Sequence, residues 1–261
     1  MLLAIDVGNT QTVVGLYEPN GPGREMLDHW RLATRSDATS DELALIIGQL
    51  LATVDMDIAA DITGVAISSG VPALTFELRA MCERYLDIEP VILGAGVKTG
   101  MPVLYDNPRE VGADRIANAV GAYDLYGGPT IVVDFGTATT FDVISENGEY
   151  MGGAIFPGIE ISMEALFGRA AALRRVELTE PRSVIGRTTA ESIQSGAIYG
   201  YSAMVDGMCE RIQEELGDAT IISTGGLASL IGPNTDSIER EEPWLTLHGL
   251  RLIWEKNQRE R

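Results

Sequence analysis

Two short segments combine an aspartate, a glycine and several hydroxyl side chains directly after an apolar run. Residues 6–12 read DVGNTQT, and residues 134–140 read DFGTATT. Such a turn offers backbone N–H groups and hydroxyls to phosphate oxygens, and its aspartate can hold a cation that offsets phosphate charge. One such turn is a weak signal, because a single occurrence is more often an ordinary β-turn, where Asp, Gly and Asn are favoured. Two copies facing each other across a duplicated fold would form a phosphate clamp.

A third segment, residues 105–115, reads YDNPREVGADR. Its proline and glycine punctuate a loop, after which Asp114 and Arg115 stand at the start of an expected helix. The carboxylate could act as a base on a hydroxyl while the guanidinium binds an anionic substrate group, and Tyr105 and Asn107 could add hydrogen bonds. The alternative is that Asp114 is only an acid favoured by the positive end of the helix dipole.

The common nucleotide-binding motifs are missing from the sequence. There is no G-x-x-x-x-G-K-[ST], and no G-x-G-x-x-G follows an apolar run. Any ATP must therefore be held in another way, which the two Asp-x-Gly turns supply. Residues 223–226, Ser-Thr-Gly-Gly, form a platform of small residues for a base or ribose, or else they only cap a strand-to-helix turn.

The elements that position these segments occur twice along the chain. A shift of 128 residues places Asp6 on Asp134, Gly8 on Gly136 and Thr12 on Thr140. Each turn lies between two apolar runs, which predicts a hairpin. A second similar pair, VAISSG at 65–70 and IISTG at 221–225, predicts a strand before a helix in each half. The chain is therefore expected to consist of two related halves.

Amphipathic segments between these strands predict helices. Ser40 is a candidate N-cap, followed by two acids in the first turn. Strands that alternate with helices indicate an α/β fold, and the hairpins make its sheets mixed rather than purely parallel. The expected helices are residues 40–51, 74–85, 113–126, 190–216 and 250–258.

Composition limits the classes of function. The 261 residues carry 19 Lys plus Arg against 38 Asp plus Glu, a formal net charge of −19, which argues against a nucleic-acid partner or an anionic membrane. Hydrophobic residues make up 45%, so a folded core is expected. Two cysteines and two histidines exclude a disulfide framework and a structural zinc site. No apolar run is long enough to cross a membrane, and a cytoplasmic location is expected.

Five motifs in order resemble the type III pantothenate kinase family. They are the Asp-x-Gly segment at the start, the Tyr-Asp-Asn-Pro…Gly-Ala-Asp-Arg block, DFGTATT, GGAIFPGI at 152–159 and IGRTTAESIQSG at 185–196. The resemblance extends over essentially the whole chain. The Asp-x-Gly turns alone would indicate only the broader actin and sugar-kinase superfamily, and the Gly-Ala-Asp-Arg block makes the resemblance specific.

The resemblance implies two duplicated ribonuclease-H-like (actin-like ATPase) lobes with mixed sheets and flanking helices, at residues 1–116 and 117–261, in a homodimer. It implies ATP-dependent phosphorylation of pantothenate at its primary hydroxyl, the first step towards coenzyme A. Asp114 would be the catalytic proton acceptor, Asp6 would lie near the Mg²⁺ that accompanies ATP, and Asp134 would bind the monovalent cation, K⁺ or NH₄⁺. The implied ATP contacts are Asp6, Val7, Gly8, Asn9, Thr10, Gln11, Thr12, Val13 and Thr137. The implied pantothenate contacts are Tyr105, Gly112, Ala113, Asp114, Arg115 and Thr189.

Two departures and two alternatives accompany the resemblance. Gln11 stands where asparagine is common, and Arg187-Thr-Thr, which includes Thr189, replaces a more usual Lys-Asn-Thr. One alternative is another small-molecule kinase of the superfamily, acting on a sugar or a carboxylic acid. The other is a non-catalytic relative, a transcription accessory protein that binds ATP without turnover. The joint presence of Asp6, Asp114 and Asp134 argues against the latter.

Overall fold

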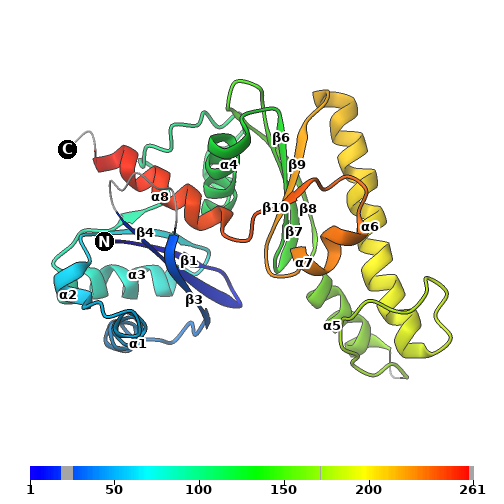
Figure 1. Cartoon of the computed structure of the whole chain (residues 1–261), viewed down its shortest axis with the longest axis horizontal. Helices are drawn as coiled ribbons and strands as arrows, with labels where there is room; N and C mark the ends of the chain where they lie inside the picture. The colour runs from blue at the N-terminus through cyan, green and yellow to red at the C-terminus, as the bar shows by residue number, and fades with distance from the viewer. Residues whose placement is uncertain (19–25, 171, 259–261) are drawn as a thin grey trace. The chain divides into compact units, whose positions relative to one another are not determined.

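The chain folds as two compact units, each around its own five-stranded mixed sheet (Figure 1). The computed structural model describes residues 1–18, 26–170 and 172–258. Unit 1 comprises Met1–Met101, Asp106–Gly121 and Leu245–Arg261, and unit 2 comprises Pro102–Tyr105 and Ala122–Trp244. None of the helices in the described part is long and apolar enough to span a membrane.

The sheet of unit 1 has the order β3-β2-β1-β4-β5. Its central strand β1 pairs antiparallel with β2 and parallel with β4. Five of the six residues of β1 are buried, as expected for an apolar strand that is covered on both faces. The strands are β1 (Leu2–Val7), β2 (Gln11–Tyr17), β3 (Met26–Ala33), β4 (Gly64–Ser69) and β5 (Val91–Ile92).

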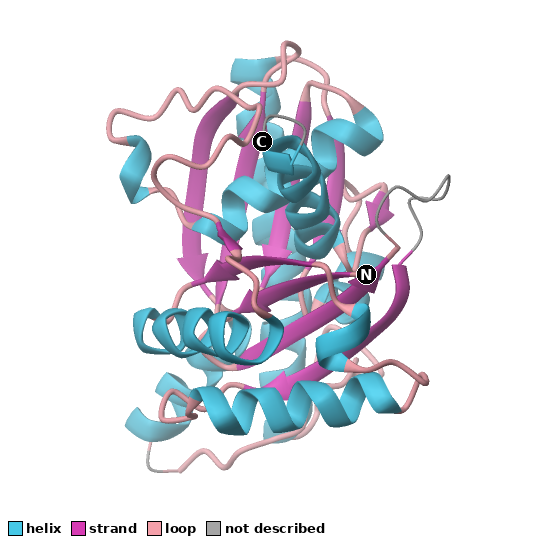
Figure 2. Cartoon of the chain, turned by 90° about the vertical axis from the view of Figure 1, so that its left-hand side faces the viewer, coloured by secondary structure: helices cyan, strands magenta, loops and turns pink. Residues whose placement is uncertain are grey.

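Helices cover this sheet on both faces. Side chains of α1 and α3 share one core with β1, β2 and β4, and these helices lie side by side across the strands in the view that faces this unit (Figure 2). Helix α8 contacts β1, β2 and β4, and lies on the other side of the sheet from α1 and α3 (Figure 1). The helical elements of unit 1 are α1 (Ser40–Ala52), α2 (Ile58–Asp61), α3 (Pro72–Met81), the π-helical turn η1 (Cys82–Leu86), the 3-10 turn η2 (Pro108–Glu110) and α8 (Leu245–Gln258). Helix α4 (Ala113–Tyr126) begins in unit 1 and ends in unit 2.

The sheet of unit 2 has the order β10-β9-β6-β7-β8. A second core joins β6, β7 and β9 to α5, α6 and α7. The strands are β6 (Thr130–Phe135), β7 (Ala138–Ile144), β8 (Tyr150–Pro157), β9 (Thr220–Thr224) and β10 (Arg240–Glu241). The helices are α5 (Ile159–Arg169), α6 (Thr189–Leu216), α7 (Ala228–Ile231) and the 3-10 turn η3 (Gly232–Asn234).

The two sheets have the same topology, which confirms the duplicated α/β fold. In each, a central strand carries a hairpin on one side and a parallel strand on the other. The constant shift of 128 residues is wrong at one point, however. Val7 pairs with Thr12, but Phe135 pairs with Thr139, because the second turn is one residue shorter. Thr12 therefore corresponds to Thr139 in the sheet and not to Thr140.

Several boundaries differ from the sequence-based expectation. Helix α8 belongs to unit 1 rather than to the C-terminal half, because it packs on β1 and β4. The N-cap of α1 is Thr39 rather than Ser40, since the Thr39 hydroxyl accepts from the Glu42 N–H while the Glu42 carboxylate accepts from the Thr39 N–H. The third strand of each sheet, β3 and β8, was not predicted.

Candidate functional site

The first Asp-x-Gly turn is closed by backbone and hydroxyl bonds. It follows β1, and the Gly8 N–H donates to the Gln11 carbonyl at 3.0 Å. Thr34, which follows β3, braces it: its hydroxyl donates to the Gly8 carbonyl at 2.8 Å and lies 2.9 Å from the Thr12 hydroxyl. Its backbone N–H donates to the Thr10 carbonyl at 2.9 Å. A fixed turn of this kind suits anion binding, because its donors need no reorganisation.

Exposure divides the predicted ATP contacts of this turn into two kinds. Asn9, Thr10 and Gln11 are exposed, so their side chains are open to a ligand. Val7 is 1% exposed and its side chain belongs to the core, so only its backbone could serve. Arg31 on β3 donates to the Gln11 side-chain oxygen at 2.8 Å, which orients that amide.

The second turn brings Asp134 against the Ser-Thr-Gly-Gly segment of unit 2. The ideal Cβ position of Gly225 lies 2.4 Å from Oδ1 of Asp134, and Asp134 pairs with Thr224 in the parallel ladder. The Gly136 N–H donates to the Ala138 carbonyl at 3.0 Å and closes the turn. Thr137 is exposed at its tip, and its carbonyl accepts from the Gly158 N–H at 3.1 Å. The predicted cation ligand and the predicted small-residue platform therefore adjoin each other.

The oxygen atoms at Asp6 and around Asp134 fit cations that would also be held by the phosphates of a bound nucleotide. Within residues 1–18, 26–170 and 172–258, no group of three or more His, Cys, Asp or Glu side chains is arranged to hold a metal. Mg²⁺ is commonly bound by one or two carboxylates together with substrate phosphates, so the single carboxylate of Asp6 in a turn that offers N–H and hydroxyl donors would suit it. Asp134, with hydroxyl and carbonyl oxygens in the adjoining turn, offers only hard oxygen ligands.

The Gly-Ala-Asp-Arg segment forms the start of α4. Gly112 accepts the Ile116 N–H at 3.2 Å and thus occupies the N-cap position. Asp114 lies in the first turn, exposed, and its Oδ1 accepts the Arg115 N–H at 2.8 Å. A Cβ at Gly112 would stand 2.4 Å from that same Oδ1. The carboxylate is therefore held at the helix start, and the absence of a side chain at Gly112 makes its position possible.

The remaining residues of this block are arranged differently. Arg115 is 8% exposed, so its guanidinium is largely buried. Asn107 caps the 3-10 turn η2: its side-chain oxygen accepts from the Arg109 N–H at 3.3 Å, and its amide donates to Glu110 at 2.8 Å. This capping role accounts for the Asn107 side chain without a contact to a substrate. Tyr105 belongs to unit 2, where its ring lies 6.5 Å from that of Tyr150.

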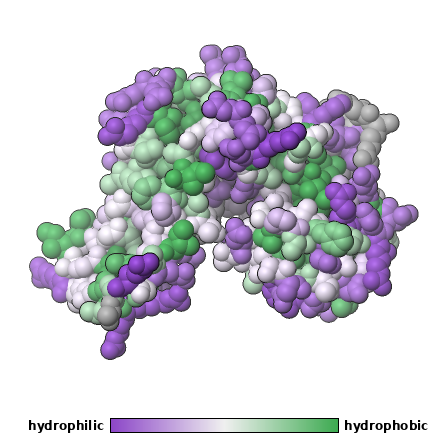
Figure 3. All heavy atoms as spheres, turned by 180° about the vertical axis from the view of Figure 1, so that it is seen from behind, coloured by the Kyte–Doolittle hydropathy of each residue, from purple (hydrophilic) through white to green (hydrophobic). Residues whose placement is uncertain are grey.

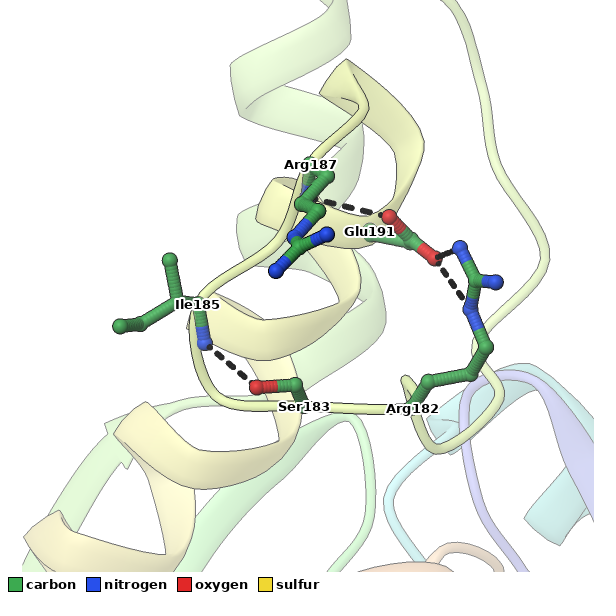
Figure 4. A pocket seen from close by; sticks show the side chains of 5 residues that line it. All are labelled: Arg182, Ser183, Ile185, Arg187 and Glu191. Atoms are coloured by element: carbon green, nitrogen blue, oxygen red, sulfur yellow. Dashed lines mark hydrogen bonds and ion pairs between the residues drawn. The ribbon is translucent and has the colours of Figure 1, made fainter.

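Thr189 is the first residue of helix α6. A pocket of about 340 Å³ is lined by Glu191 of the same helix and by residues that precede it (Figure 4). The preceding Thr188 is the N-cap, and its hydroxyl accepts from the Glu191 N–H at 3.1 Å. Arg182 and the Arg187 N–H both bind the Glu191 carboxylate and lower its pKa, and the Arg182 hydrogen bond has the larger effect. The pocket is lined by Arg182, Ser183, Ile185, Arg187 and Glu191.

The structure thus places the predicted residues in two groups. Residues 6–13 and 112–115 lie in unit 1, and Tyr105, Asp134, Thr137 and Thr189 lie in unit 2. Sequence reasoning missed Thr34, which holds the first turn. Its strand β3 was not predicted, and no local pattern connects a threonine at 34 with a glycine at 8.

Comparison with known proteins identifies the family. Residues 2–211 match the sequence model described as type III pantothenate kinase. The type III pantothenate kinase of Myxococcus xanthus is 54% identical over 258 residues, which cover 98% of this chain and 99% of the relative. The chain belongs to the type III pantothenate kinase family. The family consists of kinases that use ATP with Mg²⁺, so the chain is a phosphotransferase.

Solved structures support the fold. A Baf family transcriptional activator from Campylobacter jejuni, so described, has a TM-score of 0.61 at 18% identity and covers 98% of this chain and 99% of its own. The ROK hexokinase of Thermus thermophilus has a TM-score of 0.54 at 12% identity, and the match covers 98% of this chain and 99% of the hexokinase chain. At these identities the likeness concerns the fold alone, and it confirms the actin-like ATPase architecture of the sugar kinases.

Proposed function

We propose that this chain transfers the γ-phosphoryl group of Mg-ATP to the primary hydroxyl of pantothenate and forms 4′-phosphopantothenate, the first step of coenzyme A biosynthesis. Membership of the pantothenate kinase family over nearly the whole chain carries this proposal. The exposed Asp114 at the start of α4 is in keeping with it, since a carboxylate open to a ligand can receive a proton.

Each segment has one role in this reaction. Residues 6–13 and Thr137 bind the ATP phosphates through turn N–H groups and hydroxyls. Tyr105, Gly112, Ala113, Arg115 and Thr189 bind pantothenate. The pantothenate oxygen forms a bond to the γ-phosphorus as the bond to the ADP oxygen breaks, and the hydroxyl proton passes to Asp114. Such a reaction depends mainly on positioning and charge neutralisation.

Two cations support the proposed chemistry. When bound, Mg²⁺ near Asp6 and K⁺ or NH₄⁺ at Asp134 offset the charge of the triphosphate. A chain with a net charge of −19 that binds two anions needs such local positive charge. Asp134 beside Gly225 supports the second site, because any side chain at position 225 would clash with the carboxylate that we propose as the cation ligand.

We propose that the chain acts as a homodimer through the outer edge of unit 2. Strand β8 is the last strand of its sheet, and Ile155 is 65% and Phe156 44% exposed on it. The Phe156 ring packs edge-on against Tyr201 of α6, with ring centroids 6.0 Å apart, so side chains of β8 and α6 are in contact. On α6, no atom of a residue that the structure describes lies within 4 Å of a Cβ at Gly196, Gly200 or Gly207, apart from the helix's own backbone and chain neighbours. Exposed apolar side chains beside an open helix face favour a partner surface.

Hydrophobic side chains reach the surface among hydrophilic ones in the space-filling view from behind (Figure 3). The exposed apolar residues of β8 and α5 are Met151, Ile155, Phe156, Ile161 and Leu166.

We further propose a cytoplasmic location and no nucleic-acid or membrane partner. Cys82 and Cys209, which are both free and buried, and the strongly negative charge support this.

The test is phosphate transfer from Mg-ATP to pantothenate by the purified chain, with mass spectrometry of the product, in buffers that contain K⁺, NH₄⁺ or only Na⁺. We expect 4′-phosphopantothenate with K⁺ or NH₄⁺ and much less with Na⁺ alone. Equal rates in all three buffers would contradict the role given to Asp134. ATP binding without product would contradict the proposed acceptor, and a panel of sugars and carboxylic acids would then distinguish another kinase from a non-catalytic relative.

A further inference from the structure

A fully buried carboxylate stands on β7 of unit 2. Asp142 is 0% exposed. Its Oδ1 accepts the Tyr150 hydroxyl at 2.8 Å, and its Oδ2 accepts the Thr140 hydroxyl at 3.2 Å. Burial of a carboxylate is costly, so such a group needs hydrogen-bond partners and is rarely kept without a purpose. None of the proposed contacts with ATP or pantothenate uses it.

Tyr150 connects this carboxylate to the segment that carries Tyr105. Its backbone N–H donates to the Pro102 carbonyl, and its carbonyl accepts from the Leu104 N–H, both at 2.8 Å. Val103 forms a parallel bridge with the same residue. The backbone of the segment that ends at Tyr105 is therefore hydrogen-bonded to Tyr150 of β8, which is itself 0% exposed.

The Tyr105 ring meets the same residue. The rings of Tyr105 and Tyr150 lie 6.5 Å apart at 51°, a tilted aromatic contact. A Cβ at Gly152, where φ is +122°, would stand 3.5 Å from the Tyr105 ring. Tyr105 thus rests on Tyr150 and on a glycine of β8 with a conformation that other residues rarely adopt.

We infer that the hydrogen bond between Asp142 and Tyr150 positions the Tyr105 side chain for pantothenate. The inference rests on the proposed function, in which Tyr105 contacts pantothenate. Asp142 and Tyr150 are positioning residues, because they act through Tyr105 rather than on a substrate. A fixed Tyr150 hydroxyl holds the ring of Tyr150, and that ring limits where Tyr105 lies.

The test is steady-state kinetics of Tyr150→Phe, which removes the hydroxyl and keeps the ring. We expect the KM for pantothenate to rise about fivefold or more while the KM for ATP is unchanged. The matched control is Tyr126→Phe, which removes another tyrosine–carboxylate hydrogen bond of unit 2, to Glu242. That control should lower Tm without a change in either KM.

Two more variants separate positioning from general stability. Asp142→Asn keeps an acceptor oxygen for Tyr150, so its KM for pantothenate should stay near that of the wild type. Asp142→Ala removes the acceptor and should raise the KM for pantothenate as Tyr150→Phe does. In a Tyr105→Ala background, Tyr150→Phe should have no further effect on this KM, because the residue it positions is gone.

The outcomes distinguish the inference from the proposed function. An active wild type with an unchanged pantothenate KM in folded Tyr150→Phe and Asp142→Ala overturns the positioning role alone. Additive effects of Tyr150→Phe and Tyr105→Ala overturn it as well. A wild type without transfer to pantothenate contradicts the proposed function and the inference together.

Discussion

Gly225 and Asp134 occupy neighbouring positions that allow no side chain between them. The ideal Cβ position of residue 225 lies 2.4 Å from Oδ1 of Asp134 and 2.7 Å from the Phe135 backbone, and φ of Gly225 is +93°. Glycine is required twice, once for space and once for the backbone conformation. The turn after β9 therefore determines the position of the carboxylate that we propose as the monovalent-cation ligand.

We predict that Gly225→Ala raises the K⁺ concentration needed for half-maximal activity by about tenfold, because the methyl group displaces the Asp134 carboxylate. The matched control is Gly217→Ala at the end of α6, where φ is +90° and nothing lies within 4 Å of the Cβ. Both variants should lose about 1–3 kcal/mol of stability from the positive φ, and Gly225→Ala should lose more, because its Cβ also meets the Phe135 backbone. The measurement is the activity of both variants as a function of K⁺ concentration. The same K⁺ concentration for half-maximal activity in the two variants would contradict the prediction.

Asp114→Asn should lower kcat by about 10²–10⁴-fold, because the amide is nearly isosteric but cannot accept the hydroxyl proton. Thermal unfolding should show an intact fold. Asp87→Asn is the control: Asp87 is exposed in the same unit at φ +54°, a left-handed conformation that asparagine tolerates. A near wild-type rate in Asp114→Asn would exclude this residue as the base.

The core strands were predictable and the outer strands were not, for a physical reason. Residues 2–5 and 131–133 are unbroken apolar runs because their strands are covered on both faces. Strand β3 alternates half-buried and exposed residues and includes Asp28 and His29, so its strand character depends on pairing with β2. Strand β8 contains Gly152 and Gly153, which disfavour a strand in isolation.

The site was predictable where chemistry is local in the chain. The Asp-x-Gly turns and the Gly-Ala-Asp-Arg segment carry their backbone geometry within a few residues. The role of Thr34 was not predictable, because its hydrogen bond to Gly8 connects residues that are 26 positions apart in the chain. Helix α8 likewise joins unit 1 from the far end of the chain, and contacts of that range depend on packing that no local pattern records.

Thr34→Val should weaken ATP binding, with a KM for ATP about three- to tenfold higher, because the first turn loses its bond to the Gly8 carbonyl and its hydroxyl partner at Thr12. The KM for pantothenate should be unchanged. Thr53→Val serves as control, since it also removes a threonine–carbonyl bond in unit 1, to Leu50 at the end of α1. An unchanged KM for ATP in Thr34→Val would show that the turn does not need this brace.

Gly200→Leu should shift the chain from dimer to monomer in sedimentation velocity, because a large side chain on the open face of α6 prevents close approach of a partner. The control is Gly94→Leu in unit 1, which also has nothing within 4 Å of its Cβ. It should stay dimeric at the same concentration. A dimer that persists in Gly200→Leu would place the interface elsewhere, and a monomeric wild type would contradict the homodimer.

Glu191 should make part of the stability sensitive to acid. The hydrogen bond from Arg182, and next the Arg187 N–H, lower its pKa below the usual 4.5. A carboxyl with a lowered pKa in the folded state stabilises that state above its unfolded pKa, and this contribution is lost as pH falls through the lowered value. The Tm difference between wild type and Glu191→Gln should therefore be largest near neutral pH and should shrink at acid pH as the carboxyl becomes protonated. Glu214→Gln, at an exposed position of the same helix, is the control. A Tm difference that stays constant from neutral to acid pH would mean that the charge of Glu191 does not stabilise the start of α6.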